Sequence, residues 1–88
     1  MDRTTGIVPG QVVKSKAGRD KDRFFMVLEI KDESYLTLVD GDLRKLSKPK
    51  LKKIKHIMVT NTVIPIDTTS IHWNDSYIRK HLEPFREK

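Results

Sequence analysis

The clearest alternation of apolar and polar positions runs over residues 23–31. As a β-strand, this segment would carry one row of side chains on one face, namely Phe24, Met26, Leu28 and Ile30. The opposite face would carry Phe25, Val27 and Glu29. Because bulky apolar side chains begin both rows, the pattern predicts a strand that is covered on two sides.

Four further segments have the apolar and β-branched residues of short strands. They cover residues 11–16, 35–39, 42–47 and 52–59. Turn signals separate them: Pro9-Gly10, a loop over residues 17–22, a reversal over residues 32–34, and a break over residues 48–50. Asp40-Gly41 is a pair that type I′ hairpin turns prefer, because both central residues need positive φ. Short strands at spacings of about ten residues predict a mainly β fold, a small antiparallel barrel or sandwich.

The last part of the chain has a helical pattern instead. Asn74 is a good N-cap, and Trp73 and Ile78 stand at the two positions of a hydrophobic staple. Pro84 pushes the residue before it out of the α region, which predicts a helix over residues 74–83. The apolar stripe that would pack on the sheet consists of Ile78, Leu82 and Phe85.

The length of the chain bounds its organisation. Its 88 residues fit one domain, and a chain of this size buries only about 60 to 65% of its unfolded surface. We therefore expect a single domain over residues 1–88, with the strands within residues 7–66 and the helix packed on them. The chain has no cysteine, which excludes a disulfide framework, a thiolate zinc site and a cysteine nucleophile.

The sequence shows no signature of catalysis, of a metal site or of a small-molecule substrate. Paired carboxylates, a nucleophile motif and a glycine-rich phosphate loop are all lacking, so we expect neither enzyme activity nor a cofactor. His56, His72 and His81 do not have the spacing of metal-ligand pairs. Because no apolar run has the length of a signal peptide or of a bilayer span, we expect a cytoplasmic protein without a membrane partner.

The net charge of +6 is concentrated in one stretch of the chain. Residues 1–43 hold seven Lys/Arg and eight Asp/Glu, residues 44–66 hold seven Lys/Arg and no acid, and residues 67–88 hold four of each, which gives −1, +7 and 0. The excess lies within residues 44–55, and such a density is explained by a polyanionic partner that neutralises it. A solvated face, or edge-strand lysines that block aggregation, would give a similar run.

Several separated blocks resemble a known family. Residues 10–21, GQVVKSKAGRDK, have the pattern of a KOW motif, with a glycine, a strand, a second glycine and a basic loop. Residues 40–45, residues 52–57 and the capped helix continue the likeness to about Leu82. On these residues the chain resembles bacterial KOW-domain RNA-binding proteins, which are similar to the fourteenth large-subunit ribosomal protein of archaea and eukaryotes. The motif usually has a glycine directly after the loop lysine, where this chain has Asp22.

The resemblance implies an SH3-like β-barrel of the KOW type with a short C-terminal α-helix, over residues 7–66 and 74–83. It also implies a non-catalytic, ribosome-associated protein that binds RNA, ribosomal RNA in particular, with ribosomal proteins as neighbours in translation. Its loop and the nearby basic strands would contact phosphates. Together with the charge run, this gives the candidate RNA-binding residues Lys14, Lys16, Arg19, Lys21, Arg23, Arg44, Lys45, Lys48, Lys50, Lys52, Lys53, Lys55 and His56.

Two other functions fit the same residues. SH3-like barrels also bind peptides, so the basic patch could hold an acidic segment of a partner protein. The cations would neutralise DNA phosphates equally well, and the sequence alone does not separate RNA from DNA. The loop cations are also partly offset by Asp20 and Asp22, as local turn electrostatics alone would produce.

Overall fold

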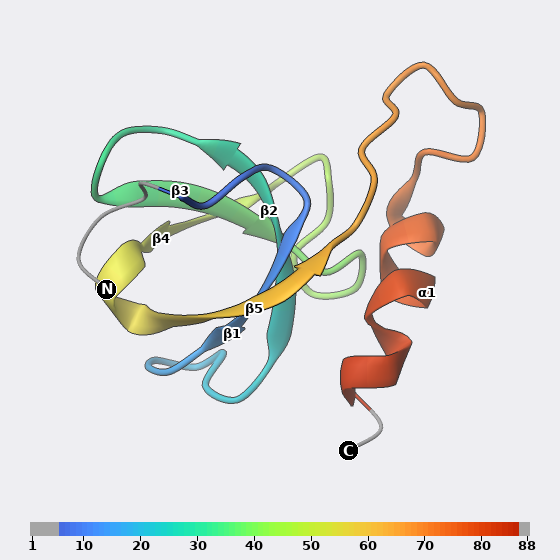
Figure 1. The fold of residues 1–88 in the computed structure, drawn as a ribbon. Helices are drawn as coiled ribbons and strands as arrows, with labels where there is room; N and C mark the ends of the chain where they lie inside the picture. The colour runs from blue at the N-terminus through green and yellow to red at the C-terminus, as the bar shows by residue number, and fades with distance from the viewer. Residues whose placement is uncertain (1–5, 87–88) are drawn as a thin grey trace.

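The computed structural model describes residues 6–86 and shows one antiparallel sheet with one helix packed against it (Figure 1). The strands are β1 (Gln11–Ser15), β2 (Phe24–Ile30), β3 (Tyr35–Val39), β4 (Lys50–Lys53) and β5 (Ile57–Val63). A short 3₁₀ helix, η1 (Ile54–His56), joins β4 to β5, and α1 (Asp75–Arg86) ends the described chain. The predicted mainly β, antiparallel fold with a short C-terminal helix is thus confirmed.

The strand order in the sheet is β4-β3-β2-β1-β5, so β2 lies in the middle. Every pairing within this order is antiparallel. β4 and β5 are the two edge strands, and no ladder joins them within residues 6–86. The chain passes from one edge of the sheet to the other through η1, which is the yellow turn in Figure 1.

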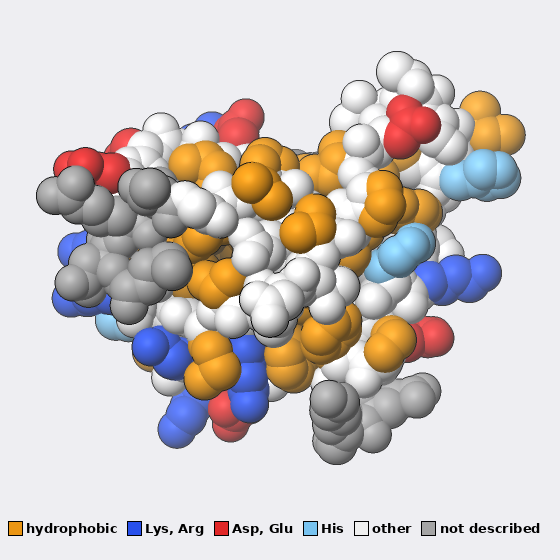
Figure 2. Space-filling view, viewed as in Figure 1, with side chains coloured by type: hydrophobic (Ala, Val, Ile, Leu, Met, Phe, Trp, Pro, Cys, Tyr) orange, Lys and Arg blue, Asp and Glu red, His pale blue; other side chains and the backbone are white. Residues whose placement is uncertain are grey.

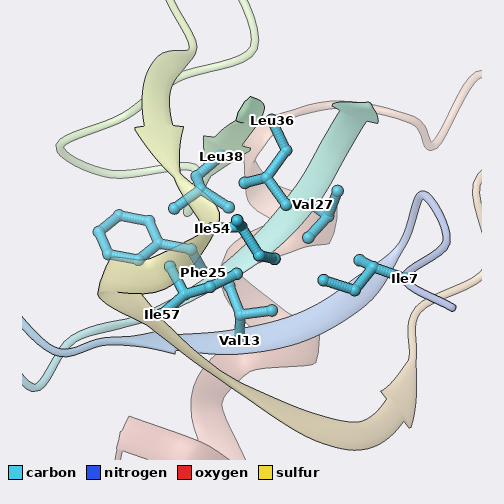
Figure 3. Close-up of a cluster of buried hydrophobic side chains, with 8 residues drawn as sticks. All are labelled: Ile7, Val13, Phe25, Val27, Leu36, Leu38, Ile54 and Ile57. Atoms are coloured by element: carbon cyan, nitrogen blue, oxygen red, sulfur yellow. The ribbon is translucent and has the colours of Figure 1, made fainter. Parts of the chain in front are cut away.

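The central strand is covered on both faces, as its sequence predicts. Figure 3 shows the cluster on the concave face, which consists of Ile7, Val13, Phe25, Val27, Leu36, Leu38, Ile54 and Ile57. The opposite face packs against α1 through a second cluster of Val12, Met26, Val39, Ile64, Ile78 and Leu82. Because side chains alternate along β2, one strand supplies both clusters.

Ile30 departs from the predicted alternation. It packs against the concave cluster with Phe25 and Val27, not on the face of Phe24 and Met26. The pairing of β2 with β3 shifts between Val27 and Glu29, so one extra residue is inserted into β2 at that point. A bulge of this kind bends the strand and moves the following side chains to the other face.

The predicted strand over residues 42–47 and the predicted type I′ turn at Asp40-Gly41 are both wrong. Only Gly41 of that pair has a positive φ, at 77°. The buried Asp40 carboxylate accepts hydrogen bonds from the backbone N–H of Asp42, at 2.9 Å, and of Arg44, at 2.8 Å. These bonds compete with strand pairing and hold the segment as a wider loop.

The predicted strand over residues 52–59 is interrupted. β4 begins at Lys50, and η1 then separates it from β5. Ile54 is 2% exposed and its N–H donates to the carbonyl of Ser34, at 2.8 Å. The chain turns at Ile54 so that this side chain is buried in the concave cluster. The alternation of apolar and polar residues in the sequence does not indicate this turn.

The helix begins as predicted and ends later than predicted. The Asn74 side chain accepts the N–H of Tyr77, at 2.9 Å, as an N-cap does. Trp73 and Ile78 both belong to the cluster between sheet and helix. Pro84, however, lies inside the helix, which continues to Arg86.

Tertiary contacts explain why the helix continues past its proline. The Phe85 ring packs on the Phe24 ring with centroids 5.2 Å apart, and Arg86 donates to Asp42 at 3.3 Å. These contacts hold the last turn and offset the hydrogen bond that proline cannot make. No helix within residues 6–86 has both the length and the apolar composition that crossing a bilayer requires.

Candidate nucleic-acid interface

The loop between β1 and β2, residues 16–23, is held in a defined shape by its own backbone. The N–H of Asp22 donates to the carbonyl of Ser15 at 2.8 Å, and the N–H of Ser15 donates to the carbonyl of Arg23 at 2.9 Å. The N–H of Lys21 donates to the carbonyl of Gly18, at 3.2 Å. The side chains of Lys16, Arg19 and Lys21 are exposed on this loop.

Asp22 has a left-handed backbone conformation, with φ at 71°. It is the one non-glycine residue with positive φ among residues 6–86. Aspartate tolerates this region better than most residues, although glycine adopts it without strain. The Asp22 carboxylate lies 3.8 Å from the Nζ of Lys14, and its side chain is 70% exposed.

Two buried carboxylates fix the arginines of the candidate set. Arg44 reaches across to Asp20 in the β1–β2 loop, at 3.2 Å, and Arg23 reaches Asp40 at 3.0 Å. The Asp20 and Asp40 side chains are 7% and 1% exposed. Residues 44–66 contain no acid, yet Arg44 is neutralised by an acid from the β1–β2 loop, so it does not belong to the unpaired positive charge of the run. Both arginines hold loops together: Asp20, expected to offset the cations of its own loop, is the partner of Arg44, and Asp40, expected in a hairpin turn, is the partner of Arg23.

The lysines of β4 are divided between the two faces of the sheet. Lys52 is the register partner of Leu36 and Lys50 that of Leu38, and both leucines belong to the concave cluster. Lys53 is the partner of Tyr35 on the opposite face, and its Nζ lies 5.8 Å from the centre of that ring. Register partners share a face, so these three lysines do not form one flat patch.

The two basic segments of the sequence meet beside η1. The Nζ of Lys52 donates to the carbonyl of Ala17 at 3.0 Å, and the N–H of Lys16 donates to the carbonyl of His56 at 2.8 Å. Lys55, in η1, is exposed. We call this region the loop–η1 surface, defined by Lys16, Arg19, Lys21, Lys52, Lys55 and His56. Figure 2 shows several Lys and Arg side chains near the lower left of the molecule, where the β1–β2 loop lies in Figure 1.

Lys45 and Lys48 belong to a different part of the molecule. Their loop is docked on α1, because the N–H of Leu46 donates to Asp75 at 2.8 Å and Arg79 donates to the carbonyl of Gly41 at 2.6 Å. Both lysines are exposed there. A run that is continuous in sequence is thus split between the α1 side and the loop–η1 surface.

The arrangement can bind an anion without any chemical step. The loop–η1 surface presents flexible lysines on a rigid backbone, which suits phosphate groups spaced along a chain. Within residues 6–86 no three His, Asp or Glu side chains gather in a group that could hold a metal ion. No family model matches the chain, and no curated protein matches it.

Proposed function

We propose that this protein is a non-catalytic RNA-binding module with the SH3-like barrel of the KOW type, acting on ribosomal RNA in the cytoplasm. The observation that carries the proposal is the meeting of the β1–β2 loop with β4 and η1. Through it, cations from two separate parts of the sequence come to lie on one surface.

The fold supports the KOW assignment in two respects. The concave cluster fills the inside of a curled five-stranded sheet, and η1 carries the chain between its edge strands. This is the arrangement expected of a small, partly open barrel. In addition, Asp22 adopts a positive φ at the position where the KOW motif usually has glycine. A glycine is favoured where the backbone needs that conformation.

The mode of binding would be electrostatic. Lys16, Arg19, Lys21 and Lys55 are exposed, and none of their side chains has an acidic partner within residues 6–86 at salt-bridge distance. When such cations bind a phosphate backbone, they release its condensed counterions, and this release makes binding favourable. Arg23 and Arg44 would act differently from the free lysines, because their ion pairs with Asp40 and Asp20 shape the loop.

An acidic protein segment is the second candidate partner, and the same exposed lysines favour it. The two partners offer different chemical groups for recognition. RNA offers phosphates at regular spacing and 2′-hydroxyl groups, whereas an acidic peptide offers carboxylates on a flexible chain. DNA lacks the 2′-hydroxyl group and otherwise presents the same charge.

The experiment is a titration of the protein with a ribosomal RNA stem-loop, with the DNA of the same sequence and with poly-glutamate, each at several salt concentrations. We expect the RNA to bind most tightly and its affinity to fall linearly on a log–log plot against salt. Tighter binding of poly-glutamate would contradict RNA as the partner. Equal affinity for the DNA would contradict recognition of RNA in particular.

A further inference from the structure

A pocket of about 410 Å³ lies where the β1–β2 loop meets the last turn of α1. Its lining residues are Lys14, Asp22, Arg23, Phe24, Phe85 and Arg86. The volume is within the range of roughly 300–1,000 Å³ that is typical of ligand sites. In Figure 1 the loop and the C-terminal end of α1 lie at the same end of the molecule, at the bottom of the view.

The pocket exists because α1 covers only part of the sheet. Val12 and Met26 are register partners on β1 and β2, and both are fully buried under the helix. Lys14 follows Val12 by two residues on β1, so it lies on the same face, and its register partner on β2 is Phe24. Both of these side chains are only half-buried, and Phe85 is the helix residue that reaches Phe24.

Two aromatic rings form the apolar part of the pocket. The centroids of Phe24 and Phe85 are 5.2 Å apart and the ring planes are inclined by 39°. Met58 lies on the other side of Lys14, as its register partner on β5, and is 54% exposed. The row of side chains on this face therefore runs from Phe24 on β2 through Lys14 on β1 to Met58 on β5, with the cation between two apolar side chains.

The cations of the pocket differ in how firmly they are held. Arg23 is fixed by the buried Asp40, as described above. Lys14 lies 3.8 Å from Asp22 and 5.6 Å from the centre of the Phe24 ring. Arg86 pairs with Asp42 at 3.3 Å, and these two side chains are 35% and 49% exposed. Exposed ion pairs contribute little free energy. A phosphate group can therefore replace Asp22 as the partner of Lys14 and Asp42 as the partner of Arg86.

We propose that this pocket binds one unstacked nucleotide of a single-stranded RNA segment. Its base would stack on Phe24 and Phe85, and its phosphate would contact Lys14 and Arg86. The inference rests on the proposed RNA-binding function and adds a single-strand site to it, because a base inside a duplex has no free face to offer. A proline-rich peptide would also suit the rings, but Lys14 and Arg86, whose ion pairs are exposed and contribute little free energy, favour an anion.

The test compares binding of single-stranded hexauridine with binding of a short duplex RNA, in the parent and in two variants. Phe85→Leu keeps an apolar side chain on the helix and removes the ring. Tyr35→Leu is the matched control. Tyr35 is 36% exposed, its ring contacts the ammonium group of Lys53, and it does not line the pocket. We expect Phe85→Leu to weaken hexauridine binding about tenfold and to change duplex binding less than about twofold. Tyr35→Leu should leave both affinities unchanged.

A second measurement uses the parent protein alone, in case Phe85→Leu does not fold. Uridine 5′-monophosphate should shift the ring resonances of Phe24 and Phe85 in an NMR titration, and inorganic phosphate should shift them less. Larger shifts with a neutral proline-rich peptide would overturn the nucleotide site. Unchanged hexauridine affinity in folded Phe85→Leu would overturn it as well, while leaving RNA binding intact. If the parent bound neither RNA, the proposed function itself would be wrong, and this site with it.

Discussion

Replacing Asp22 separates the conformational role of this residue from its charge. We consider three variants, Asp22→Gly, Asp22→Asn and Asp22→Ala, each of which removes the carboxylate. Glycine relieves the left-handed strain, asparagine tolerates it, and alanine retains a β-carbon that opposes it. If charge alone matters for RNA binding, the three should bind alike while differing in stability.

The expected stabilities follow from the backbone and from one weak ion pair. A left-handed conformation costs a residue such as alanine roughly 1–2 kcal/mol, and glycine avoids it at the expense of about 0.4–1 kcal/mol of unfolded-state entropy. The Lys14–Asp22 pair, at 3.8 Å and largely exposed, contributes less than about 1 kcal/mol. We expect Asp22→Gly within about 0.5 kcal/mol of the parent and Asp22→Ala about 1 kcal/mol less stable.

The expected affinities follow from Coulomb's law. A carboxylate about 8 Å from a phosphate in water costs about 0.5 kcal/mol, and removing it also frees Lys14. RNA binding by all three variants should therefore tighten by about twofold to fivefold. The assay is fluorescence anisotropy with a labelled RNA stem-loop, with thermal melting as the control for folding. Unchanged or weaker binding by folded Asp22→Asn would refute the placement of RNA at this loop.

Three further predictions concern stability and are checked by thermal or urea melting. Gly41→Ala should cost about 2 kcal/mol or more, since φ is 77° and a β-carbon would lie 2.2 Å from the carbonyl oxygen of Asp75. Asp40→Ala should cost about 2–4 kcal/mol, and Asp40→Asn less, because the amide oxygen can still accept the two loop N–H groups. Leu82→Ala should cost about 2–5 kcal/mol, as this side chain is fully buried between helix and sheet. A loss below about 1 kcal/mol in Gly41→Ala, Asp40→Ala or Leu82→Ala would contradict the contacts described for that residue.

Local signals predicted much of the fold. The alternation in β2 indicated its two covered faces, and Asn74 marked the start of α1, because each depends on neighbours in sequence. The bulge after Val27 and the turn at Ile54 were not predicted. Both depend on partners in other strands, so a single segment carries no sign of them. The same holds for the helix beyond Pro84, which is held by Phe24.

The sequence predicted which charged residues belong to the candidate site, but it did not predict their ion pairs or their positions on the surface. Charge counting located the excess in residues 44–55, yet it could not show that Arg44 is neutralised by Asp20, a residue 24 positions earlier. Nor could it show that Lys48 and Lys55, only seven positions apart, lie in a loop docked on α1 and in η1 respectively. From the sequence, Phe24 and Phe85 are expected only to pack in a strand and in a helix. Their meeting in one pocket depends on the position of the end of α1 beside β2.

The central claim is that the loop–η1 surface holds the RNA backbone, and two double variants test it most directly. Lys16→Ala with Lys55→Ala removes two exposed charges from that surface, and Lys45→Ala with Lys48→Ala removes two exposed charges from the α1 side. Both lower the net charge by the same amount, so effects of overall charge cancel in the comparison. A melting curve of each double variant is the control for folding.

The measurement is the slope of the RNA association constant against salt concentration, both as logarithms. Each lost phosphate contact flattens the slope by about 0.7 to 0.9, so the Lys16 and Lys55 variant should flatten it by about 1.4 to 1.8 and bind more weakly. The Lys45 and Lys48 variant should keep a slope within about 0.5 of the parent value. Equal slopes for the parent and the folded Lys16 and Lys55 variant would contradict the claim.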